Sequence, residues 1–194
     1  MHAAQLHRQF TECVAALYSP CASPGVKEQA DGWLTAFQDA PEGWTTCLAV
    51  VGDLASGAGW PQARWLESFV ASQMLATKIR RHWQTCDLVT RQQVRDVLTS
   101  QVRQTGEGES GPGAPPQQLQ KAVTKQLALG LSLLGLWGMS GGGGDGSWPL
   151  FARDVVQGMM MAPGVGGGLA APVGLMLLTH LAEEATASGP QGLC

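Results

Sequence analysis

The chain has 194 residues, a formal net charge of −3 and only 14% charged residues. Its length allows one domain with a sizeable core, or a short array of repeats. A general nucleic-acid binder usually carries Lys and Arg clustered on one face, so this acidic balance argues against nucleic acid as a partner. The most apolar run, LALGLSLLGLWGM, is shorter than the roughly 20 residues that cross a bilayer, so we expect no membrane insertion.

Apolar residues recur every three or four positions in two stretches near the N-terminus. This spacing places them on one face of a helix. Between the stretches, SPCASPG predicts a loop in which Ser23 caps the second helix and Pro24 occupies its first turn. Two helices joined by a short loop form a helical hairpin. The two stripes are Leu6, Phe10, Cys13 and Leu17, and then Val26, Ala30, Trp33 and Phe37.

A second pair is predicted from the short helix PEGWTTCLAVVGDLA, the turn SGAGWP and a helix that begins near Pro61. The opposite side of that longer helix mixes Glu67, Lys78 and Arg81 with Val70 and Met74. A helix that contacts neighbours on more than one side would bury such apolar residues, as in a solenoid. Its main apolar face consists of Trp65, Phe69, Ser72, Ala76, Ile79 and Trp83.

Two further pairs follow, and strand signals are nearly absent. TRQQVRDVLTSQVRQ pairs with LQKAVTKQLALGLSLLGLWGM, and WPLFARDVVQGMMM pairs with APVGLMLLTHLAEEA. The unit recurs about every 40 residues, near the period of HEAT or armadillo repeats. We therefore expect an all-α fold, an α-solenoid of HEAT/armadillo-like helical hairpins. Its expected parts are repeats 1–2 and the first helix of repeat 3 (1–104), a flexible Gly/Pro-rich loop (105–118), repeats 3–4 with Gly-rich inserts (119–185) and a disordered tail (186–194).

Reactive or metal-binding groups do not form a recognisable motif. GMSGGGGDGSW lacks the lysine of a P-loop, and GVGGGLAAP lacks the strand and acidic residue of a dinucleotide fold, so both indicate linkers. Glu183 and Glu184 indicate an exposed acidic helix end. We expect no enzyme activity, cofactor or metal. The histidines are scattered at His2, His7, His82 and His180.

The five cysteines include no CxxC pair and no histidine at zinc-ligand spacing. They suggest reduced thiols in the cytosol or nucleus, with Cys13 and Cys47 as core residues. The seven tryptophans recur mostly within the helical stripes, which favours core packing over a ligand cage.

Two stretches carry a more specific pattern. VAALYSPCASPGVKEQADGWLTAFQDAPEGW and FVASQMLATKIRRHW together resemble the N-terminal end of nuclear transport receptors of the importin-β (karyopherin) superfamily, nearest the transportin-SR and importin-13 branch. TKQLALGLSLLGLWGM and GLMLLTHLAEEA are similar to later segments of these receptors. The Gly-rich inserts depart from the family, and Ala182 stands where proline is common. The matching positions are Lys27, Ala30, Leu34, Phe37, Gln38 and Trp44, then Phe69, Ala71, Gln73, Lys78 and Ile79.

The resemblance implies a function. Such receptors bind the GTPase Ran in its GTP state on a concave face lined by the second helix of each pair. Ran binding opposes the binding of protein cargo, a class that includes Arg/Ser-rich proteins, and the receptors also bind nucleoporins while shuttling between nucleus and cytoplasm. Cargo-contacting repeats lie mostly beyond this part, so we expect an N-terminal fragment or a truncated gene model.

The resemblance also suggests which residues contact the partner. We expect Glu67, Gln73, Lys78 and Arg81 to form a polar strip toward Ran; the alternative is a solvated helix face. The second candidate function is a HEAT-repeat scaffold for protein interactions that does not bind Ran.

Overall fold

The computed structural model describes residues 2–56, 62–105, 117–139, 150–160 and 169–188. Within these ranges all regular structure is helical and no strand occurs, which confirms the predicted all-α class. The elements are α1 (His2–Tyr18), α2 (Pro24–Asp39), α3 (Glu42–Gly52), η1 (Asp53–Ser56), α4 (Gln62–His82), η2 (Trp83–Thr85), α5 (Leu88–Thr105), α6 (Gln117–Met139), α7 (Phe151–Met160) and α8 (Ala171–Ser188).

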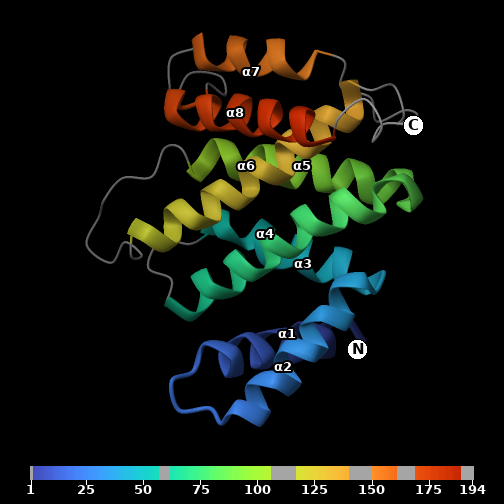
Figure 1. Cartoon of the computed structure of the whole chain (residues 1–194), viewed down its shortest axis with the longest axis vertical. Coiled ribbons are helices and arrows are strands. Elements are labelled where there is room, and N and C mark those ends of the chain that lie inside the picture. Colours follow the sequence, from blue (N-terminus) through green and yellow to red (C-terminus); the bar gives the residue numbers. More distant parts are fainter. Residues whose placement is uncertain (1, 57–61, 106–116, 140–149, 161–168, 189–194) are drawn as a thin grey trace.

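Neighbouring helices pack in pairs that follow the chain order: α1 with α2, α3 with α4, α5 with α6, and α7 with α8. The second helices of the later pairs also pack on one another, since α4 contacts α6 and α6 contacts α8. Figure 1 shows the resulting order, with α1 and α2 at one end of the long axis and α7 and α8 at the other.

The first hairpin forms as its sequence predicts. The hydroxyl of Ser23 accepts a hydrogen bond from the Val26 amide at 3.4 Å, and Pro24 opens α2. Pro24 costs little there because the first amides of a helix have no partner within the helix. At the other end the Ala40 amide donates to the Phe37 carbonyl, and α3 begins almost at once. The last turn of α2 therefore lies directly beside the start of α3.

Helix α4 is buried on more than one side. Trp65 and Ile79 of its predicted apolar face are buried, and so are Val70 and Met74 of the opposite side. Small side chains such as Ala71 allow the close approach of neighbouring helices. These positions confirm that α4 packs between neighbours rather than lying on the surface, and one apolar cluster runs from α1 to α8.

The last helix differs from expectation at its end. Helix α8 continues to Ser188, so residues 186–188 of the expected tail are helical. Apolar side chains are exposed at this end of the molecule. Most of the expected 105–118 loop, the run SGGGGDGS and most of PGVGGGLA lie outside the described residues. None of the described helices combines the length and hydropathy required to span a membrane. The exposed apolar residues of this end are Leu150, Val156, Met160 and Leu175.

Candidate partner-binding surface

The structure places Lys78 in the interior, not on an exposed strip. Its residue is 1% exposed, and its Nζ donates hydrogen bonds of 2.7 Å each to the carbonyls of Gln38 and Ala40. These carbonyls lie at the C-terminal end of α2, where helix carbonyls lack partners within the helix and the helix dipole is negative. The Ala40 carbonyl also accepts a hydrogen bond from the Gly43 amide at 3.1 Å. The Nζ also lies 5.1 Å from the ring centroid of Trp44, a cation–π distance. Lys78 therefore fastens α4 to the α2–α3 junction.

The packing around Lys78 shifts two pKa values, that of its own ammonium and that of the Cys47 thiol. Burial lowers the pKa of the Lys78 ammonium. The nearby Cys47 and Asp39 raise this pKa, but by less than burial lowers it. Burial raises the pKa of the Cys47 thiol to about 12, which keeps this thiol uncharged. Cys47 is a core residue, as predicted, and Cys13 is partly buried against the same cluster.

Glu67 is also buried, with 4% of its surface exposed. Its Oε2 lies 3.4 Å from Nη1 of Arg64, one turn earlier on α4. The expectation of one exposed strip is therefore wrong for Glu67 and Lys78, because packing against neighbouring helices covers both. Gln73 and Arg81 are exposed, as expected.

The exposed polar groups of α4 gather instead at its C-terminal end. We call Arg80, Arg81 and His82 the α4 terminal turn; cations there are favoured by the negative end of the helix dipole. His82 Nε2 lies 3.2 Å from Oδ1 of Asp39 on α2, and Arg81 Nη1 lies 3.9 Å from the same oxygen. The terminal turn thus contacts α2 through a shared carboxylate.

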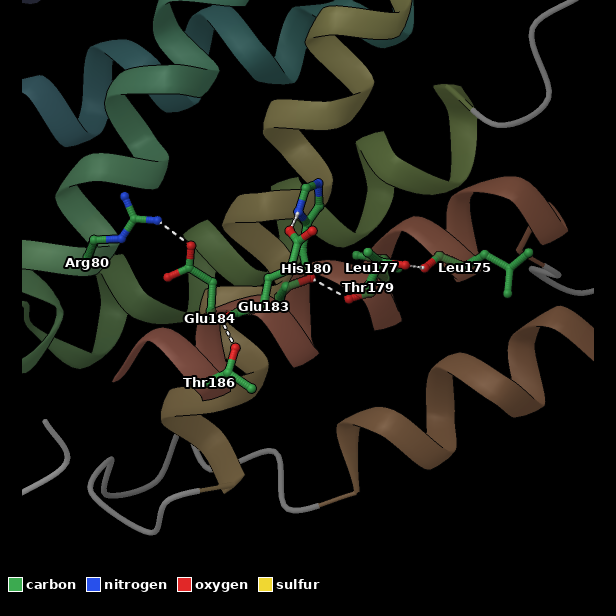
Figure 2. Close-up of polar contacts among 9 residues, drawn as sticks. Arg80, Leu175, Leu177, Thr179, His180, Glu183, Glu184 and Thr186 are labelled. Carbon is green, nitrogen blue, oxygen red and sulfur yellow. Dashed lines mark hydrogen bonds and ion pairs between the residues drawn. The ribbon is translucent and has the colours of Figure 1, made fainter. Parts of the chain in front are cut away.

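The same turn reaches α8 on its other side. Arg80 Nη2 lies 2.6 Å from Oε1 of Glu184, so this ion pair joins α4 to α8 directly (Figure 2). One turn earlier on α8, Nδ1 of His180 lies 3.1 Å from Oε2 of Glu183. Glu184 is mostly buried and paired, so the prediction of a plain exposed acidic helix end is wrong for this residue. Its partner comes from a helix about a hundred residues earlier in the chain, which no local pattern could indicate.

The titrating side chains near α4 are spread over several helices. Within the described ranges, no three His, Cys, Asp or Glu side chains gather as a possible metal site. His82 and His180 lie on different helices, each beside a carboxylate. The exposed surface of α4 offers Gln73 and the terminal turn, groups suited to hydrogen bonds and ion pairs across an interface.

Comparison of the chain with protein-family models, with curated proteins and with solved structures finds no match. The importin-β assignment therefore depends on the sequence resemblance alone.

Proposed function

We propose that the helical pairs form a HEAT-type α-solenoid whose second helices line a protein-binding face. The successive packing of α4 on α6 and of α6 on α8 carries this proposal. In a solenoid each unit packs on its neighbours, and the row of equivalent helices creates an extended surface for a partner.

We infer that this face binds Ran in its GTP state, as the N-terminal part of an importin-β-type nuclear transport receptor. The sequence resemblance in α2 and α4 supports Ran as the partner. Gln73 and Arg81 are exposed on α4, the second helix of its pair, so both are available for contact. Binding of cargo and nucleoporins by further repeats, with shuttling between nucleus and cytoplasm, belongs to the same proposal.

A HEAT-repeat scaffold without Ran binding is the alternative, and one observation favours it. Lys78 and Ile79, which carry part of the resemblance, are buried at helix–helix contacts. A repeat protein of another function could retain these residues for packing alone, so their presence does not require Ran.

A pull-down with purified Ran distinguishes Ran binding from the scaffold function. The chain is expected to retain Ran loaded with GTP but not Ran loaded with GDP, and Arg81→Glu is expected to reduce that capture. Arg153→Glu is the matched control, because it makes the same charge change at an exposed position of α7. Equal capture of both nucleotide states, or none of either, would favour the scaffold; unchanged capture by Arg81→Glu would reject the residue assignment.

A further inference from the structure

The ion pair between Arg80 and Glu184 links two helices that are not neighbours in the stack. In the described ranges α4 and α8 each pack extensively on α6, but not on each other. A repeat in a solenoid normally contacts only the repeats next to it. Arg80 Nη2 nevertheless lies 2.6 Å from Glu184 Oε1, so the second pair of helices is linked to the fourth (Figure 2). We call this contact the α4–α8 clasp.

Small residues of α6 lie beside the two helices that the clasp joins. A Cβ atom added to Gly130 would already touch the side chain of Ile79, the residue before Arg80, at 3.7 Å. Two residues later the buried Ser132 hydroxyl donates a hydrogen bond of 2.9 Å to the Leu177 carbonyl of α8. A larger side chain at either position would push the neighbouring helix away. The clasp therefore forms where α6 is thin enough for α4 and α8 to approach each other.

The last turns of α8 have little attachment besides the clasp. Leu177 and Leu181 are buried in the core, but beyond them the helix leaves it. From residue 182 to residue 187, every residue except Glu184 is exposed. The Glu184 side chain is 21% exposed because it lies against Arg80 of α4. The position of this helix end therefore depends on one ion pair.

Ions in solution can weaken the clasp but not the buried contact of α8. The Arg80 side chain is 49% exposed, so water and salt reach the pair. The screening length falls from about 30 Å at 0.01 M salt to about 3 Å at 1 M, and buried pairs are screened much less. The Ser132–Leu177 hydrogen bond lies in the interior, and Glu184 follows Leu177 by about 10 Å along the helix. Helix α8 therefore has one attachment that resists salt and one that yields to it.

We propose that the α4–α8 clasp is a salt-sensitive switch that sets the position of the last turns of α8 relative to α4. With the ion pair formed, residues 182–188 are held beside the C-terminal end of α4. With the pair screened or removed, these residues move away, while the buried part of α8 around Leu177 stays on α6. The switch is independent of Ran binding; under the proposed function it changes the shape of one end of the protein-binding face.

Pulsed electron paramagnetic resonance between labels at Gln73 of α4 and Ala187 of α8 measures this position in the full chain, with the native cysteines replaced. Both labelled residues are exposed. Glu184→Gln is expected to lower the population at the wild-type distance about twofold to fivefold relative to longer distances, the effect of a partly exposed pair. A label at Thr179, near the buried contact, should report no change when it replaces the label at Ala187.

Glu183→Gln is the matched control. It makes the same change of charge on the same helix, but the Glu183 carboxylate lies 3.1 Å from His180 of α8 itself. It should therefore leave the distance between Gln73 and Ala187 unchanged. Exchange of the two charges, Arg80→Glu with Glu184→Arg, should restore the wild-type distances, whereas Arg80→Glu alone should increase the population at longer distances.

A salt series gives a second test in which the ion pair itself is intact. Between about 0.01 M and 1 M salt, the labelled chain with Arg80 and Glu184 should shift toward the distances of Glu184→Gln, and the variant should not respond. Unchanged distances in Glu184→Gln, an equal shift in Glu183→Gln, or a charge exchange that does not restore the wild-type distances would overturn the proposal. Distances that do not depend on salt when the pair is intact would overturn it as well.

Discussion

Replacing Lys78 with Met tests the role of the buried ammonium in holding α4 against α2. Methionine has a similar length and volume but donates no hydrogen bond. The Gln38 carbonyl, 2.7 Å from Nζ, would then lose this donor, while the Ala40 carbonyl would keep the Gly43 amide at 3.1 Å. A buried acceptor left without a partner costs about 1–3 kcal/mol. One acceptor left without a partner and one weakened acceptor, offset by relief from burying a charge, predict a loss of about 1–3 kcal/mol in the free energy of unfolding.

Urea unfolding followed by tryptophan fluorescence measures this loss. Lys125→Met is the control, because Lys125 is exposed on α6 and such surface changes usually stay within about 0.5 kcal/mol. Thermal unfolding should show a fall in Tm of roughly 2–12 °C for Lys78→Met, since about 1 kcal/mol shifts the Tm of a chain this long by 2–4 °C. If Lys78→Met and Lys125→Met change stability equally, Lys78 does not fasten the two helices.

Three further predictions concern other parts of the fold. The Cys47 thiol stays protonated in the native state to about pH 12, whereas an ordinary thiol ionises near pH 9. The contribution of this thiol to the free energy of unfolding is therefore fully present below pH 9 and is lost progressively between pH 9 and about pH 12. The stability difference between wild type and Cys47→Ala should therefore shrink by about 1.4 kcal/mol from pH 8 to pH 10 in urea titrations. Gly32→Ala should stabilise the chain by about 0.5–1 kcal/mol, because its Cβ meets open space in a helix. Gly135→Ala should destabilise it by about 1–3 kcal/mol, because the added Cβ would lie 2.2 Å from the Phe151 ring. Differential scanning calorimetry compares the two variants. Glu184→Gln breaks a partly exposed ion pair and should cost at most about 1 kcal/mol, with a smaller difference in high salt.

A specific result would contradict each of these three predictions. A pH-independent difference for Cys47→Ala would mean that the thiol ionises equally in both states. Gly135→Ala at or above wild-type stability would mean that the Phe151 ring does not pack closely on Gly135. A loss from Glu184→Gln that does not depend on salt would indicate a packing role instead of an ion pair.

The helices and much of the core could be predicted because helical spacing is a local signal. Phe10, Ala30 and Phe37 lie on predicted stripes and are buried. The mixed sides of α4 also predicted its position between neighbours, since Val70 and Met74 could not both be exposed at low cost. Val26 departs from its stripe and is 46% exposed, because a residue in the first turn of α2 lies near the edge of the contact.

The candidate surface was harder to predict because its groups depend on distant segments. A lysine in a polar pattern looks exposed, and the two carbonyls that bind Lys78 lie about forty residues earlier in the chain. Glu184 likewise finds Arg80 only after α4, α6 and α8 have packed. The close packing of Phe151 on Gly135 had no sequence signal either, because a glycine in a helix does not indicate which side chain will approach it.

The order of the helices along the molecule is the claim on which the protein-binding proposal depends. It is tested most directly by pulsed electron paramagnetic resonance between spin labels on exposed residues, with the native cysteines replaced. One label is placed at Thr35 of α2 and the other at Gln73 of α4, Lys125 of α6 or Thr179 of α8. A stack predicts that the distance from Thr35 increases in that order, because α2, α4, α6 and α8 follow one another along the long axis (Figure 1). A Thr179 label as close to Thr35 as the Gln73 label would show a bundle closed around one centre and contradict the stack.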